Sequence, residues 1–289
     1  MSRTDDKLTK ALVADTSTWR LVLRIEDDAL EVVLYSNHED NTLIHRRIDL
    51  GTPTAATSGA PNPRGVSRLQ LLEDAIYDNP LLLGDYASVY CIVATERFII
   101  APLDYAADAD DCARMMQIAY PGFDGELICA PTGSRNATLL MGIDTDLAAF
   151  LNRTFLNPRI CHPLSPLCRY YMSTGGKSNA PKTFVTLRDT SLDLIIIDKG
   201  NLLLANTFKF AEPSDALYYI MAARHHLNLD DTAHEVMVAG SSRHREDITS
   251  LLRKYIARVM PVIFPSRMFK AGTEAMHAPF DLIVMPLCE

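Results

Sequence analysis

The sequence is short of several features that normally indicate a function. Its 28 Lys and Arg residues are outnumbered by 36 Asp and Glu residues, which gives a net charge of −8. Because nucleic-acid binding needs clustered Lys and Arg to neutralise phosphates, this balance argues against a nucleic-acid partner. No run approaches the roughly 18 consecutive apolar residues of a membrane-spanning helix, and the N-terminal MSRTDDKLTK lacks the apolar core of a signal peptide. We therefore expect a cytoplasmic protein without a membrane span.

Paired cysteine motifs are also missing. The six cysteines, at positions 91, 112, 129, 161, 168 and 288, are scattered, and most lie within apolar runs such as VYCIVA and LICAP. This distribution predicts reduced, buried thiols and no disulfide framework. The tightest Cys/His group is Cys161, His162 and Cys168, whereas a zinc site uses close pairs such as CxxC matched by a second pair. The sequence therefore predicts no metal site.

The second part of the chain contains a regular succession of strand-like and helical runs. Three strand-like runs come first, TFVTLRD, SLDLIIID and NLLLANTFKF, with Lys199-Gly200-Asn201 as a hairpin signal between the last two. They are followed by a helical EPSDALYYIMAARHHLNLD, the short apolar strand of HEVMVAGSS, a helical DITSLLRKYIARV and the strand MPVIF. The order β-β-β-α-β-α-β predicts an antiparallel meander and then parallel strands reached through helical crossovers.

An earlier and fainter copy of this pattern begins at Trp19, with WRLVLRIEDD, ALEVVLYSN, NTLIHRRIDL, the helical VSRLQLLEDAIYD and the strand SVYCIVAT. The two copies predict a duplicated α/β fold with a cleft between its halves, residues 1–172 and 183–289, joined by a linker at 173–182. Residues 96–155 have no counterpart in the second copy and predict an α/β insertion in the first half. The Gly- and Pro-rich stretch 51–65 predicts a surface loop.

The C-terminal APFDLIVMPLCE is apolar enough to be either a last core strand or a docking segment. We favour the core strand, because an exposed stretch of this kind would promote aggregation.

The duplicated order resembles the actin-like ATPase superfamily, in which two RNase H-like halves bind nucleotide in the cleft between them. A closer resemblance is to a family of bacterial proteins of unassigned function with that fold. It rests on NLLLANTFKF leading into PSDALYYIM, on AGSS and on the Cys-Glu C-terminus, and it covers most of the chain. The resemblance implies an actin-like fold with a mixed β-β-β-α-β-α-β sheet core in each half, but no particular activity. A more distant resemblance is to the actin-like scaffold proteins of pilus and secretion machinery.

The nucleotide motifs of that superfamily are only partly present. The turn between the first two strands should carry an acid followed closely by glycine, but here it is EDDA (26–29), whose three carboxylates would repel a triphosphate unless Mg²⁺ intervened. The matching turn RDTS (188–191) has an acid and two hydroxyls but again no glycine, and the stop VAGSS (238–242) keeps one glycine where two are usual. The candidate nucleotide-binding positions are therefore Asp27, Asp189, Thr190, Gly240 and Ser241. Solvated turns and a serine helix cap explain the same residues without a ligand.

Two functions of different classes fit these residues. The first is a non-catalytic adaptor or scaffold, whose cleft has lost its phosphate loops and whose partner is another protein or a second copy of the chain. The second is a divergent ATPase or nucleotide-binding switch, in which Asp27 and Asp189 hold the Mg²⁺ of Mg-ATP and Gly240 lies beside the base. A small-molecule phosphotransferase is a weaker variant of it. The missing glycines favour the adaptor, for which we predict no catalytic residue and no cofactor.

Overall fold

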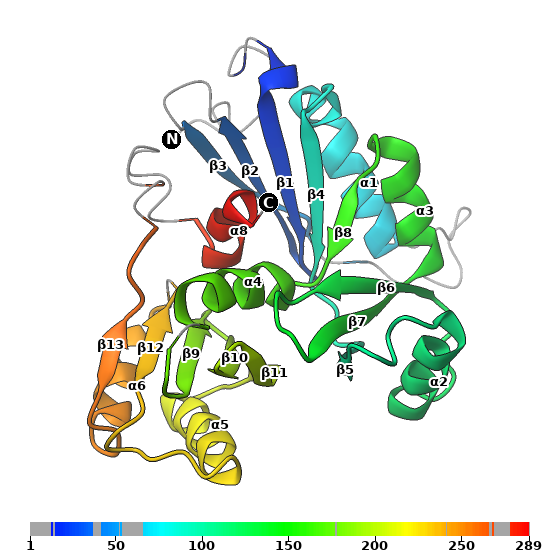
Figure 1. Cartoon of the computed structure of the whole chain (residues 1–289). Helices are drawn as coiled ribbons and strands as arrows, with labels where there is room; N and C mark the ends of the chain where they lie inside the picture. The colour runs from blue at the N-terminus through cyan, green and yellow to red at the C-terminus, as the bar shows by residue number, and fades with distance from the viewer. Residues whose placement is uncertain are drawn as a thin grey trace, which may run out of the picture.

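Two five-stranded sheets, a smaller three-stranded sheet and the helices around them make up the described part of the molecule (Figure 1). The computed structural model describes residues 13, 15–36, 42–51, 53, 66–176, 178–240, 242–265, 268 and 278–288. The first half contains η2 (Thr16–Thr18), β1 (Trp19–Ile25), β2 (Ala29–Ser36), β3 (Leu43–Asp49), α1 (Arg68–Tyr77), η3 (Pro80–Leu83), β4 (Ser88–Val93), α3 (Thr145–Thr154), β8 (Arg159–Cys161) and α4 (Leu164–Gly175). The second half contains β9 (Lys182–Leu187), β10 (Ser191–Asp198), β11 (Asn201–Lys209), α5 (Pro213–His226), β12 (Val236–Ala239), α6 (Arg245–Leu252) and β13 (Val259–Pro261). Two short helices, α8 (Phe280–Val284) and η5 (Met285–Leu287), follow. No helix in the described ranges is long and apolar enough to cross a membrane.

The two large sheets have the same topology. The first has the order β3-β2-β1-β4-β8 and the second β11-β10-β9-β12-β13. In each, the first three strands in sequence form an antiparallel meander, and the last two run parallel to the first strand. Each parallel strand is reached through a helix, as a crossover requires. The predicted duplication of a β-β-β-α-β-α-β unit is confirmed.

The apolar runs of the sequence are continuous where they form the central strands of the two large sheets, because consecutive residues of these strands are buried. Leu194, Ile195 and Ile196 of β10 are all fully buried, as are Leu21 and Val22 of β1. Side chains on both faces of these strands are covered, which is typical of the interior of an α/β sheet.

The predicted hairpin between β10 and β11 is also confirmed. Lys199 and Gly200 both have positive φ values, 49° and 82°, as expected of a turn whose twist matches that of the strands.

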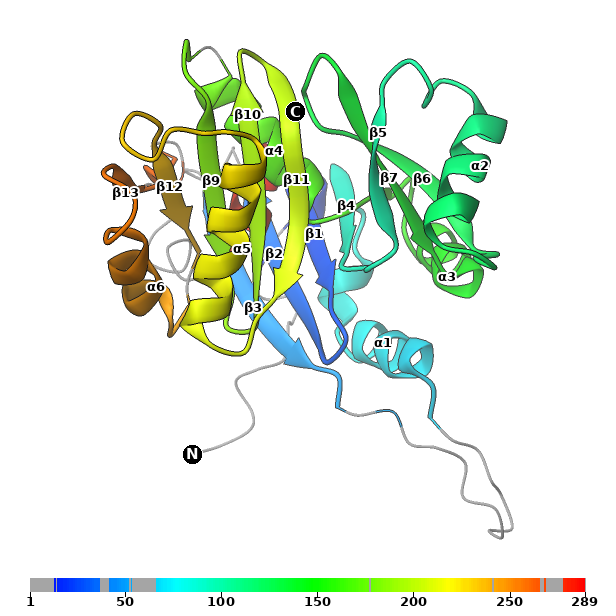
Figure 2. The ribbon, with the colours of Figure 1, turned by 90° about the horizontal axis from the view of Figure 1, so that it is seen from below.

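The insertion forms its own sheet, of order β5-β7-β6, with one helix against it (Figure 2). Its elements are β5 (Phe98–Pro102), α2 (Ala109–Ala119), β6 (Glu126–Pro131) and β7 (Ala137–Ile143). Helix α3, which the predicted insertion of residues 96–155 included, packs with the first large sheet instead. Its Phe150 belongs to that core and meets Tyr77 of α1 edge to face, with ring centroids 6.2 Å apart.

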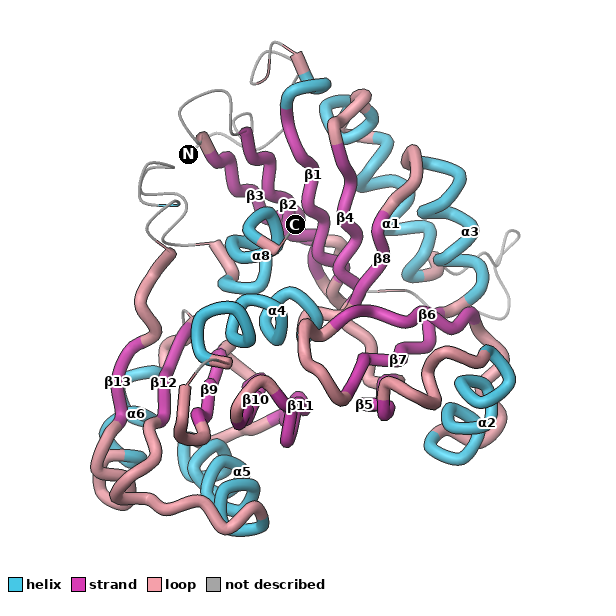
Figure 3. Tube along the Cα trace, viewed as in Figure 1, coloured by secondary structure: helices cyan, strands magenta, loops and turns pink. Residues whose placement is uncertain are grey.

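Helices α4 and α8 lie side by side between the two large sheets (Figure 3). Each one contacts the sheet of the other half. Tyr171 of α4 stacks on Phe184 of β9 at 4.1 Å between ring centroids, whereas α8 contacts β1. Phe280 of α8 meets Tyr170 of α4 edge to face at 5.6 Å. The predicted division into residues 1–172 and 183–289 therefore separates two parts of the chain, but each part places one helix against the sheet of the other.

The C-terminal segment is buried, as favoured from the sequence, but the predicted core strand is wrong because residues 280–287 are helical. Pro279 and Pro286 bracket the segment. Proline has no N–H to give to a strand ladder, so only a very short strand could form between them.

The predicted linker at 173–182 begins too early. Helix α4 continues to Gly175, and β9 begins at Lys182. Gly175 fits inside the helix because it packs tightly on the second sheet: a Cβ there would lie 2.8 Å from the ring of Phe184. The predicted loop at 51–65 lies almost entirely outside the described residues.

Candidate functional site

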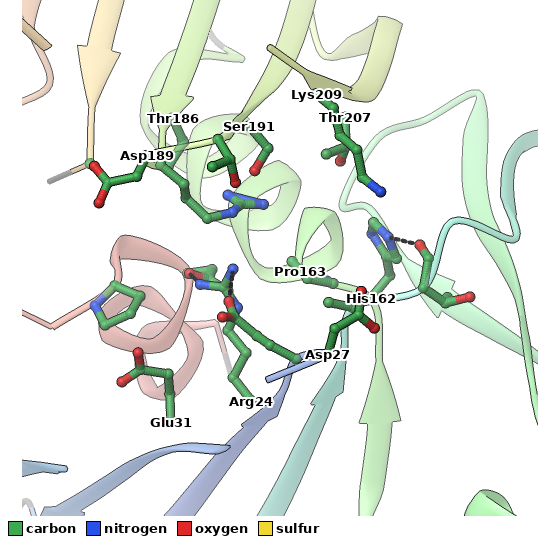
Figure 4. Close-up of a pocket in the computed structure, with 18 of the residues that line it drawn as sticks. Arg24, Asp27, Glu31, His162, Pro163, Thr186, Asp189, Ser191, Thr207 and Lys209 are labelled. Carbon is green, nitrogen blue, oxygen red and sulfur yellow. Dashed lines mark hydrogen bonds and ion pairs between the residues drawn. The ribbon is translucent and has the colours of Figure 1, made fainter. Parts of the chain in front are cut away.

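A cavity of about 980 Å³ opens between the two halves (Figure 4). Residues from both large sheets, the insertion and α8 line it. Four of the five predicted binding positions are among them, Asp27, Asp189, Thr190 and Gly240. Ser241 lies outside the described residues. The two turns identified from the sequence therefore face one cleft, with Asp27 projecting from the first half and Asp189 from the second.

Several carboxylate side chains lie in the turn between β1 and β2 and on the strands beside it. Arg47 of β3 lies within ion-pairing distance of four of them: its guanidinium nitrogens are 2.9 Å from Glu31, 3.2 Å from Asp49, 3.6 Å from Asp28 and 3.8 Å from Glu26. Asp27 at the tip of the turn forms an ion pair with Arg68 of α1. One guanidinium shared by four carboxylates leaves net negative charge on this side of the cleft.

Glu31 is the most buried of these acids, with 5 % of its surface exposed. Its two oxygens lie 2.9 Å from Arg47 Nη1 and 2.7 Å from His45 Nε2. Burial acts to raise the pKa of Glu31, but the hydrogen bonds from His45 and Arg47 outweigh it and hold the pKa below its ordinary value. The stabilisation from this ionised carboxylate is present at neutral pH and is lost as the pH falls through the lowered pKa.

The matching turn between β9 and β10 is closed by a bidentate ion pair. Arg188 donates from Nη1 and Nη2 to the two oxygens of Asp193, at 2.5 and 2.8 Å, and Asp193 is fully buried. Thr207 of β11 donates a further hydrogen bond of 2.7 Å to the same carboxylate. Asp189 accepts a hydrogen bond from the backbone N–H of Arg243, at 3.0 Å. The guanidinium nearest this turn is therefore held by Asp193.

A second buried arginine joins the first sheet to α8 at the edge of the cavity. Arg24 of β1, 2 % exposed, donates to Asp281 at 2.9 Å and forms an ion pair of 2.6 Å with Glu26. Burial disfavours its charge, but Asp281 and Glu26 outweigh that effect and raise the pKa of Arg24. The cation and its two acids therefore form a charged contact that fixes α8 on β1.

Gly240 ends β12 with a positive φ of 91°. A Cβ atom at this position would lie 2.1 Å from the carbonyl oxygen of Leu187 and 2.8 Å from its nitrogen, so the backbones of β12 and β9 approach too closely for any side chain. This contact requires glycine whether or not a ligand is bound.

His162 lies just after β8, at the inner wall of the cavity, and 2 % of its surface is exposed. Its Nδ1 accepts from the backbone N–H of Leu164 at 3.2 Å, so its Nε2 carries the proton and donates to the carbonyl oxygen of Thr95, 3.0 Å away. Burial is the main cause that lowers the pKa of His162 to about 3, although the Thr95 hydrogen bond acts against it. The neutral imidazole bridges two backbone segments.

This histidine should make the protein sensitive to acid. The ordinary histidine pKa near 6.5 applies to the unfolded chain, so the unfolded state binds a proton that the folded state excludes between about pH 6.5 and pH 3. Stability should therefore fall by about 1.4 kcal/mol per pH unit in this window from this group alone. We expect the His162→Gln variant to be less stable at pH 7 but to lose about 2–3 kcal/mol less between pH 6.5 and 4.5, as measured by urea unfolding.

The exposed His226→Gln change serves as the matched control and should leave the pH profile parallel to that of the wild type. If His162→Gln also ran parallel to the wild type, the neutral buried imidazole would be contradicted.

Contacts across the cleft connect the insertion to the second half. Glu96 forms an ion pair with Lys209 of β11. The side-chain amide of Asn136 accepts from Leu202 N–H at 2.9 Å and donates to Leu202 O at 3.1 Å, as a neighbouring strand would. The insertion therefore holds both ends of β11.

Acids outnumber cations around the cavity. Among the described residues, seven carboxylate side chains line it against four Arg and Lys side chains, an excess of three negative charges when the histidines are neutral. In the described ranges, no group of three or more His, Cys, Asp and Glu side chains has the arrangement of a metal site.

Sequence reasoning missed Arg24, Asp193 and Asp281, which form the buried ion pairs behind the two turns. Each is a single charge within an apolar run, in LVLRI, SLDLII and PFDLIV. A charge in such a run is seldom buried without a partner, and this signal could have identified all three.

The comparisons with known proteins support the fold. Over 95 % of this chain and 97 % of the other, the structure is similar to a Bacteroides thetaiotaomicron protein described as having an actin-like ATPase fold and unknown function, with a TM-score of 0.74 and 18 % identity. It is also similar to a chain in the structure of a PilM–PilN type IV pilus biogenesis complex, over 93 % of this chain and 97 % of that one, with a TM-score of 0.55 and 13 % identity. The predicted actin-like fold class is confirmed.

No protein with a curated description matches the sequence. A family model described as a protein of unknown function, DUF3822, matches residues 11–259. The chain therefore belongs to the DUF3822 family, which confirms the family resemblance seen in the sequence.

Proposed function

We propose that this protein is a non-catalytic adaptor or scaffold that uses an actin-like fold to bind another protein. The observation that carries this proposal is the chemistry of the cleft, which opposes a bound polyphosphate. The described part of the lining has three more carboxylates than cations, so a triphosphate with about four negative charges would be repelled at short range. A partner surface that presents Lys or Arg would be attracted by the same charge.

The state of the arginines supports the same proposal. Arg188, at the position where phosphate would enter the second turn, gives two hydrogen bonds to Asp193. Arg24 is shared between Asp281 and Glu26. If either guanidinium turned from its carboxylate to a phosphate, the buried Asp193 or Asp281 would lose its charged partner, at a cost of several kcal/mol. Neither turn has a glycine to bring backbone N–H groups close to a phosphate.

Similarity to a chain of a pilus biogenesis complex adds a reason to look for a protein partner. That structure is described as a PilM–PilN complex, an assembly of two proteins. For this chain, an assembly with another protein or with a second copy remains part of the proposal.

The alternative is a divergent nucleotide-binding protein or ATPase switch. One observation favours it: Asp27, Asp189, Thr190 and Gly240, which come from three separate parts of the sequence, line the same cavity. Mg²⁺ between the two aspartates would reduce the repulsion that the charge count imposes.

Thermal unfolding in the presence of nucleotides distinguishes the two functions. We expect no change in melting temperature with millimolar Mg-ATP, Mg-ADP or Mg-GTP, because every Arg and Lys among the described residues that line the cavity is already in an ion pair. A nucleotide at 100 times its dissociation constant would stabilise the native state by about 2.7 kcal/mol, which the melting temperature would report clearly.

The Asp189→Ala variant decides how a shift would be interpreted, with the exposed Asp104→Ala, outside the cavity, as its charge-matched control. A shift that disappears in Asp189→Ala and persists in Asp104→Ala would contradict the adaptor and support the switch.

A further inference from the structure

Two cysteines of the insertion lie within contact distance of each other. Cys112, in the first turns of α2, and Cys129, on β6, have their sulfur atoms 3.9 Å apart. Cys112 is 5 % exposed, whereas Cys129 is exposed and differs in this from the other five cysteines, all of which are buried. The sequence predicted buried thiols, and the exposure of Cys129 corrects that prediction.

The packing around this pair explains the exposure of only one sulfur. Cys129 pairs with Leu140 of β7, so its side chain lies on the sheet face that α2 covers. Cys112, Met116 and Leu140 form a small core on that face, together with Ala101. Cys129 is at the edge of this core, where one side of its sulfur meets Cys112 and the other meets solvent.

We propose that Cys112 and Cys129 are a thiol modification site that low-molecular-weight disulfides convert into an intramolecular disulfide. The thiolate of Cys129, the accessible sulfur, attacks the disulfide RSSR, forms a mixed disulfide and releases one RS⁻. The thiolate of Cys112 then attacks the Cys129 sulfur, which forms the Cys112–Cys129 bond and releases the second RS⁻. Two protein protons end on two RSH molecules, so atoms and electrons balance. The sulfurs must approach from 3.9 Å to about 2.05 Å, a change within reach of side-chain rotation.

The disulfide would join α2 to β6, close to the segment through which the insertion contacts α4 and β11. Strand β6 ends at Pro131, whose carbonyl accepts a 2.7 Å hydrogen bond from Ser165 of α4, and the next loop carries Asn136, which holds β11. The site is therefore on the part of the insertion that contacts the second half.

The experiment treats the whole protein with oxidised glutathione and measures intact mass and peptide maps with time. We expect a loss of about 2 Da, mapped to Cys112–Cys129 and reversed by dithiothreitol. Burial and the neighbouring Cys112 raise the pKa of Cys129 to about 11, so the rate should rise about tenfold per unit between pH 7.5 and 9.5.

Two single variants make the result unambiguous. Cys112→Ser should stop at a glutathione adduct on Cys129, and Cys129→Ser should remain unmodified over the same time. A wild-type protein that stops at the adduct, or a disulfide that maps to other cysteines, would overturn the proposal.

Discussion

Replacing Gly240 with alanine should destabilise the protein by about 3 kcal/mol or more. The added Cβ would lie 2.1 Å from the carbonyl oxygen of Leu187, and the atoms of Leu187 that it meets all belong to the backbone, so no side chain can move aside. The positive φ of 91° adds about 1 kcal/mol of conformational strain for a residue with a side chain. Urea unfolding of the variant measures the loss.

Gly122 provides a matched control for this prediction. It also has a positive φ, 80°, but a Cβ there would have no atom within 4 Å. Gly122→Ala should therefore cost only about 1 kcal/mol of conformational strain. Equal losses in the two variants would show that the left-handed conformation alone, and not the contact with Leu187, makes glycine necessary at 240.

Removing the Arg224 side chain should have an effect of similar size. This residue, in the last turn of α5, is fully buried, and its guanidinium donates hydrogen bonds to several acceptors. It donates to Asp231 at 3.0 Å, to the Thr183 hydroxyl at 2.9 Å and to the carbonyl oxygens of Asp230 and His234 at 3.2 and 3.4 Å. Arg224→Ala would leave these acceptors without their donor and an arginine-sized cavity, so we expect a loss of about 3–5 kcal/mol.

Two further variants isolate the cause. Arg114→Ala removes an exposed helical arginine whose ion pair is with Asp111, and it should change the unfolding free energy by less than about 0.5 kcal/mol. Arg224→Lys keeps the charge but cannot donate in four directions, so its stability should fall between those of the wild type and Arg224→Ala. A lysine variant as stable as the wild type would mean that charge alone is needed at this position.

Local sequence patterns predicted the parts of the fold that depend on local structure. The alternation of strands and helices, the Lys199-Gly200 hairpin and the repeated order of the halves follow from hydrophobic period and turn chemistry. The placement of Asp27 and Asp189 on one cleft follows from the duplication, because equivalent turns of two related halves face each other.

Contacts between distant segments were not predictable in the same way. Arg24 and Asp281 are 257 positions apart, and no local pattern states that a C-terminal helix will reach the first strand. The helical state of residues 280–284 is equally a result of tertiary packing, since five residues form too short a helix to be stable alone. The single charges in the apolar runs could have indicated that Arg24 and Asp281 are buried, but only the structure shows that they pair with each other.

The exchange of α4 and α8 between the halves has a mechanical consequence. Because each half contributes the helix that supports the other sheet, the halves cannot separate as independent bodies without exposing Tyr171 and Phe184 to water. An opening of the cleft that preserves this packing would therefore have to rotate the halves about α4 and α8. Phe280 and Asp281 belong to α8 and also line the cavity, so an occupant of the cleft would contact this helix directly. We therefore expect an occupant of the cleft to change the angle between the halves through its contact with α8.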